Sequence, residues 1–243
     1  MPTVLILGAA SDMAVAIAKK YASKGFNVQL AARNTGRLQA LQSDIAIRYN
    51  VQCSLHEFDA LNFESHQSFF YNLDHKPEIT ICVFGYLGDN EIARANWNES
   101  AKIINTNYTG AVSILNVVSN FYAAQKSGTI VGISSVAGER GRQSNYMYGS
   151  AKAGFTAYLS GLRNRMFHEN VHVASVQPGF VYTAMTANMK LPPLLTAKPE
   201  DVANTVFNAA AKKKNVVYVK WFWRWIMLII KSVPEFMFKK LKL

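Results

Sequence analysis

The chain has little charge, few acidic residues and only two cysteines, and these shortages exclude several classes of protein. Only 17% of its 243 residues are charged, whereas 50% are hydrophobic and 12% are aromatic. Such a composition supplies far more burial than a disordered polymer could use. The length predicts one compact domain, and a long disordered binding tail is excluded.

The two cysteines, Cys53 and Cys82, lie in separate apolar runs without CxxC spacing, and no secretion signal is evident at the N-terminus. We therefore expect a reduced, cytoplasmic protein, and we expect no metal site. The longest apolar run, 221–230, contains Arg224 and is about half the length that spans a bilayer. No transmembrane helix is expected.

The shortage of acidic residues is concentrated at one end of the chain. The chain has 26 Lys and Arg against 15 Asp and Glu, which gives a net charge of +11. Nine of these cations lie in 212–243, where the one acidic residue is Glu235. The rest is nearly balanced, so a nucleic acid partner is not expected. Aromatic residues accompany these cations, which predicts that 221–243 contacts an anionic membrane surface. The alternative is that the aromatic residues close an oligomer interface or cover the substrate cleft.

Short apolar runs typical of strands alternate with segments of helical periodicity from residue 3 to about residue 211. Strands separated by helices of this length predict βαβ units and a parallel sheet covered on both faces. The segment 178–199 is too long for an ordinary connection, and we interpret it as a substrate lid. The expected strands are 3–7, 27–32, 51–58, 79–84, 129–134 and 171–177, and the expected helices are 12–24, 36–49, 64–73, 99–126, 146–168 and 199–211.

The first predicted strand enters a helix through Leu7-Gly8-Ala-Ala-Ser-Asp12-Met-Ala14. The free N–H groups of a helix N-terminus favour anions, so a dinucleotide pyrophosphate is expected here. An ordinary strand–turn–helix with Ser11 or Asp12 as N-cap is the alternative. Because the carboxylate of Asp12 would repel a pyrophosphate, we expect it to turn back and cap the helix.

The second predicted strand ends at Ala31-Ala32-Arg33-Asn34, without an acidic residue. An acid at this position hydrogen-bonds the ribose 2′-OH of NAD, whereas an arginine suits the 2′-phosphate of NADP. We therefore expect NADPH, with NAD less favoured. The alternative is that Arg33 is an ordinary surface residue.

Tyr148 and Lys152 stand four residues apart in a predicted helix and so share one face. An ammonium beside a phenol lowers the phenol pKa, which suits proton transfer near neutral pH. Ser135, thirteen residues before Tyr148, ends a predicted strand, where a hydroxyl points into the ligand crevice of a parallel sheet.

These motifs, together with Asn107-Tyr-Thr-Gly110 and Pro178-Gly179-Phe-Val-Tyr-Thr183, resemble in order and spacing the short-chain dehydrogenase/reductases. The resemblance covers about residues 3–212. It implies a Rossmann-type doubly wound sheet, a dinucleotide-binding and catalytic domain in 1–215, and a last strand with amphipathic helices in 216–243.

The resemblance also implies roles for individual residues. Tyr148 would be the general acid, Ser135 would hydrogen-bond the substrate carbonyl oxygen, and Lys152 would bind the nicotinamide ribose. Asn107 would hold a proton-relay water. The implied cofactor-binding residues, with Thr183 at the carboxamide and Asp59 at the adenine, are Gly8, Ala10, Ser11, Asp12, Met13, Arg33, Asp59, Ala60, Gly85, Tyr148, Lys152, Pro178, Gly179, Val181 and Thr183.

Three of these residues also have an ordinary structural explanation. Ser135 would cap a strand end, Asn107 would cap a helix and Thr183 would be a loop hydroxyl. Two motifs depart from the family pattern: only Gly8 remains of the glycine-rich turn, and Phe84-Gly-Tyr-Leu-Gly-Asp89 replaces the usual Asn-Asn-Ala-Gly.

Four features together resemble one branch of the family, the decaprenylphosphoryl-2-keto-ribose reductases. They are the second departure, the turn at Gly8, the aromatic, basic C-terminus and the segment Pro178-Gly-Phe-Val-Tyr-Thr-Ala-Met-Thr186. That likeness implies a lipid-linked 2-keto sugar as substrate, and the family likeness implies a homodimer or homotetramer. A reductase of soluble β-ketoacyl, steroid or small carbonyl compounds is the first alternative. A non-catalytic nucleotide-binding scaffold is the second.

Overall fold

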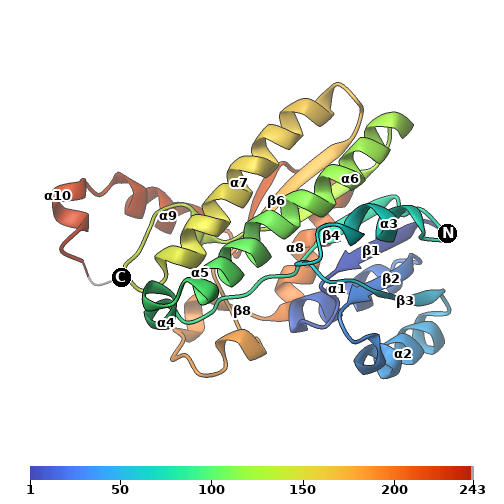
Figure 1. Ribbon diagram of the computed structural model, residues 1–243, viewed down its shortest axis with the longest axis horizontal. Helices are drawn as coiled ribbons and strands as arrows, with labels where there is room; N and C mark the ends of the chain where they lie inside the picture. Colours follow the sequence, from blue (N-terminus) through green and yellow to red (C-terminus); the bar gives the residue numbers. More distant parts are fainter. Residues whose placement is uncertain (242–243) are drawn as a thin grey trace.

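The computed structural model describes residues 1–241, in which seven strands form one parallel sheet (Figure 1). This arrangement confirms the doubly wound α/β fold that the alternation predicts. The sheet runs in the order β3-β2-β1-β4-β5-β6-β9, and its strands are β1 Thr3–Leu7, β2 Asn27–Ala32, β3 Cys53–Glu57, β4 Ile79–Cys82, β5 Thr129–Ile133, β6 His172–Pro178 and β9 Val216–Val219.

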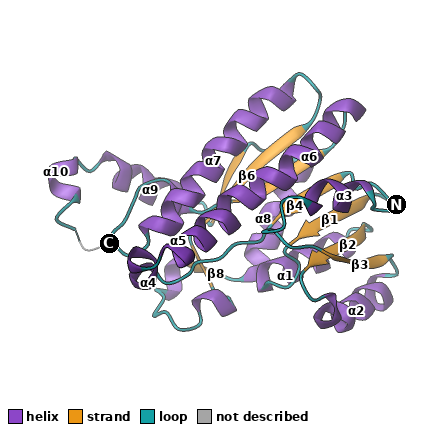
Figure 2. Cartoon of the chain, viewed as in Figure 1, coloured by secondary structure: helices purple, strands orange, loops and turns teal. Residues whose placement is uncertain are grey.

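Helices cover both faces of this sheet (Figure 2). One apolar core joins the sheet to α1, α2 and α8, and a second core joins the opposite face to α3, α6 and α7. The helices are α1 Asp12–Ala22, α2 Gln39–Tyr49, α3 Ser65–Tyr71, α4 Asn90–Ala95, α5 Trp97–Ile104, α6 Gly110–Gln125, α7 Tyr146–Phe167, α8 Pro199–Ala211, α9 Trp223–Ser232 and α10 Glu235–Phe238.

Strand β1 shows why the sequence takes this form. All five of its residues are buried, with Val4 and Ile6 in the core of one face and Leu5 and Leu7 in the core of the other. Successive strand residues point to opposite faces, so a strand covered on both sides must be apolar throughout. The uninterrupted apolar runs therefore predict these central strands well.

The strand order reverses between β1 and β4, which places a ligand crevice at the carboxyl ends of these two strands. Gly8 follows β1 with φ +92°, and a Cβ there would lie 2.6 Å from the Cβ of Phe84, which follows β4. Glycine is needed at this position both for the backbone conformation and for the close approach. The two turns meet at the floor of the crevice.

The chain after β9 forms α9 and α10, which lie at the end of the molecule opposite the N-terminus (Figure 1). Pro234 separates the two helices. Trp223 and Met227 of α9 are buried, whereas Trp225 and Ile229 are exposed. None of the helices in residues 1–241 is long and apolar enough to cross a bilayer.

Candidate active site

Two adjoining clefts open at the carboxyl ends of the strands, and Gly85 lines both of them. The first, the substrate cavity, has a volume of about 130 Å³, and the second, the dinucleotide cleft, has a volume of about 580 Å³. The expected site residues in the substrate cavity are Met13, Gly85, Ser135, Tyr148, Lys152, Pro178, Gly179, Val181 and Thr183. Those in the dinucleotide cleft are Gly8, Ala10, Ser11, Arg33, Asp59, Ala60 and Gly85.

Helix α7 places Tyr148 and Lys152 on the wall of the substrate cavity, one turn apart. Lys152 is only 3% exposed, and its Nζ donates a hydrogen bond to the Ile133 carbonyl at 3.0 Å. The same Nζ lies 5.8 Å from the centroid of the Tyr148 ring. Ser135 follows β5 in extended conformation, and its Oγ accepts a hydrogen bond from the Ala137 N–H at 3.1 Å. Ser135 is therefore both a local cap and part of the cavity wall.

Burial governs the protonation of both α7 residues. It lowers the pKa of Lys152 to about 8 and raises the pKa of Tyr148 to about 12, and a hydrogen bond with Ser135 opposes the second shift. The expectation that Lys152 brings the phenol pKa below its ordinary value is wrong for this structure. The ammonium is directed to the Ile133 carbonyl, and the desolvation of the phenol dominates.

Asn107 lies outside both clefts, in a π-helical turn between α5 and α6. Its side chain is buried, accepts from the Tyr86 N–H at 3.2 Å, and donates to the Tyr86 and Ile103 carbonyls at 2.6 and 2.8 Å. Both of its N–H groups are used. Asn107 thus fixes the backbone beside Gly85, and its role in holding a relay water stays a prediction.

Asp12 does not cap α1, so that expectation is corrected. Ser11 has the extended backbone of an N-cap, and its Oγ accepts from the Ala14 N–H at 3.3 Å. Asp12 is the first helical residue, and its Oδ2 accepts from the Ala184 N–H at 2.7 Å. The carboxylate therefore ties the start of α1 to the 178–199 segment, where that segment passes the substrate cavity.

The dinucleotide cleft fits an extended anionic ligand. Ala10 and Ser11 bring the N-terminal turn of α1 to it, and both Arg33 and Arg37 line it. Its one acidic wall residue among those described, Asp59, accepts from the Leu61 N–H at 3.0 Å. Lys152 at the shared end has one hydrogen-bond acceptor within the described residues, which leaves two of its three N–H groups for a ligand.

The expected lid, 178–199, forms a wall of the substrate cavity and carries a short parallel pair, β7 Phe180–Val181 and β8 Thr196–Ala197. Helix α9 closes the same cavity from outside. The indole of Trp223 packs against Gly179 and Phe180, and its Nε1 donates to the Leu195 carbonyl at 3.2 Å. One face of the C-terminal segment therefore covers the substrate cleft, which is the alternative weighed above. Residues 242 and 243 of the expected membrane-contacting segment lie outside the described residues.

Sequence reasoning missed several residues of the clefts, among them Arg37, Arg142, Asn145 and Trp223. Arg37 follows Arg33 by four residues, a spacing that could have suggested a pair. Arg142 and Asn145 lie in an irregular segment before α7, where no periodicity in the sequence indicates which way the side chains point.

Comparison with known proteins places this geometry in context. Residues 2–192 match the family model described as short chain dehydrogenase. The chain is 32% identical over 241 residues to an uncharacterised oxidoreductase of Mycobacterium tuberculosis, Rv2073c, with 98% of this chain and 96% of that protein covered. It is 30% identical over 215 residues to the 3-oxoacyl-[acyl-carrier-protein] reductase FabG of Aquifex aeolicus, with 83% and 87% covered.

Solved structures show the same fold. A short-chain dehydrogenase from Sphingobium yanoikuyae in complex with NADPH superposes with a TM-score of 0.83 at 20% identity, covering 97% of each chain. A 7β-hydroxysteroid dehydrogenase superposes with a TM-score of 0.87 at 20% identity, covering 99% of this chain and 96% of the other. The likeness extends over nearly the whole of each chain and shows that the fold is shared.

Proposed function

Because the chain belongs to the short-chain dehydrogenase/reductase family, and is thus an NAD(P)-dependent oxidoreductase, we propose that it reduces a ketone with NADPH and that the ketone is a lipid-linked 2-keto sugar. The observation that carries the reductase assignment is the meeting of Tyr148, Ser135 and Lys152 on one cavity that adjoins a dinucleotide cleft. A non-catalytic scaffold would not need that arrangement.

The dinucleotide, when bound, supplies the hydride. Tyr148 then donates its proton to the carbonyl oxygen, and a phenol whose pKa is about 12 stays protonated, and able to donate, at neutral pH. The Ser135 hydroxyl donates a hydrogen bond to the same oxygen. Lys152 would hold the nicotinamide ribose through the N–H groups that Ile133 leaves free.

A preference for NADPH is supported by charge. Arg33 and Arg37 both line the dinucleotide cleft and both are exposed, with no carboxylate within an ion-pair distance among the described residues. Glu57, at the end of β3, accepts from the Asn34 and Thr35 N–H groups at 2.8 and 3.3 Å and is thereby engaged. Two free guanidinium groups suit a 2′-phosphate.

A lipid-linked substrate is supported by the outer face of the C-terminal segment, and so is membrane contact. Trp221, Trp225, Ile229 and Phe236 are between 54% and 74% exposed, on the same segment whose inner face closes the substrate cavity. Exposed aromatic and apolar residues interleaved with lysine and arginine favour the headgroup region of an anionic membrane. The likeness to the decaprenylphosphoryl-2-keto-ribose reductase branch points to the same substrate class.

A soluble β-ketoacyl or similar substrate is the second candidate, supported by the likeness to FabG and by the enclosure of the cavity by Trp223. In that case the outer face of α9 would pack against another copy of the chain in a dimer or tetramer. A native mass measurement with and without anionic vesicles separates these two uses of the face.

Oxidation of NADPH in the presence of a polyprenyl-phosphoryl 2-keto-pentose in detergent micelles tests the proposal, with a β-ketoacyl thioester as the soluble comparison. We expect turnover of the lipid-linked substrate, better with NADPH than with NADH, and its loss in Tyr148→Phe. Turnover of the thioester alone would move the substrate class to the second candidate. Unchanged turnover in Tyr148→Phe would remove the catalytic assignment.

A further inference from the structure

One cation in the substrate cavity has no use in the chemistry above. Arg142 is half-buried, lines the same cavity as Tyr148, and has an Nε that is inaccessible to solvent and without a hydrogen-bond partner among residues 1–241. Among the described residues, its one side-chain hydrogen bond runs from Nη2 to the Met227 sulfur at 3.4 Å. A thioether is a weak acceptor and leaves the charge uncompensated.

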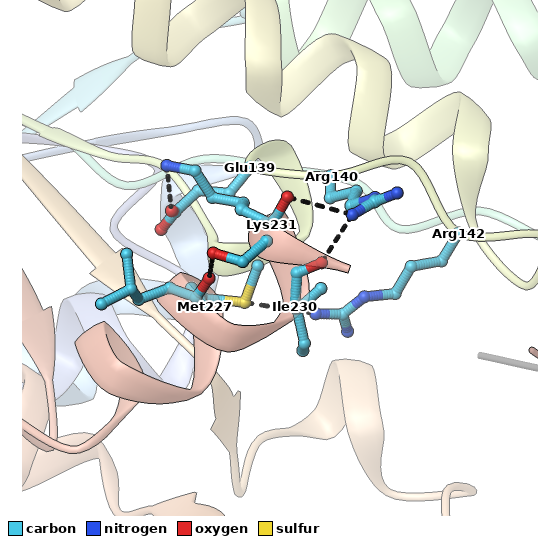
Figure 3. Close-up of polar contacts among 8 residues, drawn as sticks. Glu139, Arg140, Arg142, Met227, Ile230 and Lys231 are labelled. Atoms are coloured by element: carbon cyan, nitrogen blue, oxygen red, sulfur yellow. Dashed lines mark hydrogen bonds and ion pairs between the residues drawn. The ribbon is translucent and has the colours of Figure 1, made fainter. Parts of the chain in front are cut away.

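The arginine two residues earlier provides an internal comparison (Figure 3). Arg140 donates to the Ile230, Lys231 and Val233 carbonyls at 2.6, 3.1 and 2.6 Å, and it pairs with Glu235 at 3.0 Å. Arg140 therefore satisfies the C-terminal carbonyls of α9 and holds that helix in place. Anchoring of α9 does not require Arg142 as well.

The carboxylate nearest in sequence to Arg142, that of Glu139, makes no ion pair with it among the described residues and is engaged through one oxygen, while its Oε1 is buried without a hydrogen-bond partner there. Glu139 pairs with Lys231 at 3.2 Å (Figure 3). Burial has the larger effect on the Arg142 guanidinium and lowers its pKa. The negative charge of Glu139 has a smaller effect and raises that pKa. A guanidinium is a strong donor of paired hydrogen bonds, and one without an acceptor in a cavity favours an anion.

A second polar group beside Arg142 is also unsatisfied. Asn145 lines the same cavity, and its Oδ1 is buried without a hydrogen-bond partner among the described residues. Asn145 is the N-cap residue of α7, but its side chain accepts no hydrogen bond from that helix. An acceptor of this kind suits a ligand hydroxyl. Apolar side chains, Met185 and Trp223 among them, line the cavity together with the candidate catalytic residues.

We propose that Arg142 is the specificity-determining residue that binds an anionic group of the ketone substrate, a phosphodiester or a carboxylate, while Asn145 accepts a hydrogen bond from a hydroxyl of the same molecule. This inference rests on the proposed function, because it assigns the ketone at Tyr148 and the anion at Arg142 to one molecule. It selects hydroxylated, anionic ketones over neutral ones. A keto sugar joined to a phosphodiester has both features.

Two pairs of ketones that differ in charge test this inference in the full-length enzyme with NADPH. The phosphodiester pair is a short alkyl-phosphoryl 2-keto-pentofuranose and the neutral alkyl glycoside of the same sugar. The carboxylate pair is acetoacetate and its ethyl ester. The anionic member of one pair is expected to have a kcat/KM about 10- to 100-fold above its neutral partner, the range of a hydrogen bond to a charged group. The pair that shows this preference identifies the source of the anion.

Arg142→Gln is expected to remove that preference while leaving kcat/KM of the neutral ketone within about threefold, and Arg142→Lys is expected to restore part of it. Arg140→Gln is the matched control, because it loosens α9 and lowers both members of a pair together. Equal losses for both members in Arg142→Gln, or no preference in the wild type for either pair, would overturn the inference.

Failure of the proposed function gives a different pattern. If Tyr148→Phe keeps full turnover, the reductase assignment fails, and a binding measurement then judges Arg142 alone. With NADP⁺ saturating, so that the phosphate contacts of the dinucleotide cleft are occupied, methyl phosphate and acetate are titrated against tryptophan fluorescence. Binding of either probe that Arg142→Gln weakens at least tenfold supports the anion site. Binding that Arg142→Gln leaves unchanged overturns it.

Discussion

Replacing Lys152 with methionine is expected to abolish reduction and to stabilise the fold. Burial moves the pKa of Lys152 from 10.5 to about 8, and each pKa unit corresponds to about 1.4 kcal/mol. The protonated side chain therefore costs the folded state about 3 kcal/mol relative to a neutral one. Methionine has similar length and no charge, but it leaves the Ile133 carbonyl without its donor, at a cost of about 1 kcal/mol.

The expected net gain is about 2 kcal/mol at pH 7, which for a domain of this size raises Tm by about 4–8 °C. Thermal unfolding of wild type and variant without dinucleotide measures it, and Lys24→Met, at an exposed lysine, is the matched control with an expected effect within about 0.5 kcal/mol. Turnover is measured on the same preparations, because the gain in stability and the loss of activity must occur together.

The pH dependence has a definite sign. Because the folded pKa of Lys152 lies below the unfolded one, the unfolded state binds more protons between pH 8 and about pH 10.5, so the wild type gains stability on that rise. The Tm advantage of Lys152→Met is therefore full below pH 8 and nearly gone by about pH 10. A variant that is less stable than the wild type at pH 7, or an advantage that does not shrink with rising pH, would refute the argument from burial.

Three further changes test other parts of the site. Replacing Arg33 and Arg37 together with alanine is expected to raise KM for NADPH at least tenfold and to leave KM for NADH nearly unchanged, as steady-state kinetics would show. In Gly179→Ala the new Cβ overlaps the Trp223 indole, so we expect faster proteolysis of the C-terminal segment and a lower kcat/KM. Ser11→Ala removes the α1 cap and is expected to lower the free energy of unfolding by about 1 kcal/mol in urea.

The sequence predicts the sheet well because each central strand must be apolar on both faces, and only a few short patterns satisfy that requirement. The expected strand 129–134 appears as Thr129–Ile133, and the expected helix 146–168 appears as Tyr146–Phe167. The expected helical stretch 99–126 is less regular. It is interrupted at Asn105–Thr109 by a π-helical turn, whose extra residue lets Asn107 reach back to the Tyr86 backbone.

Long-range contacts account for what the sequence could not predict. Asp12 has a side chain typical of a helix N-cap, but its hydrogen-bond partner is the backbone N–H of Ala184, 172 positions away. Trp223 and Met227 stand four residues apart and so share one face of α9. Only the tertiary structure, which places Gly179 and Arg142 opposite them, identifies this face as the buried one. Local periodicity gives the elements, and the side-chain partners across the cleft follow from the tertiary fold.

Two cations of the substrate cavity, the buried Lys152 and the half-buried Arg142, support one argument about its chemistry. Lys152 and Arg142 come from different parts of the cavity wall, burial lowers the pKa of both, and neither has a carboxylate within an ion-pair distance among the described residues. A fold selected for stability alone would pair or replace them, because an uncompensated buried charge is costly. Their presence favours negative charge in the cavity, which supports the proposed binding of an anionic group of the substrate. On the proposed function, Arg142 meets the anionic group of the substrate and Lys152 lies beside the phenol that gives up its proton.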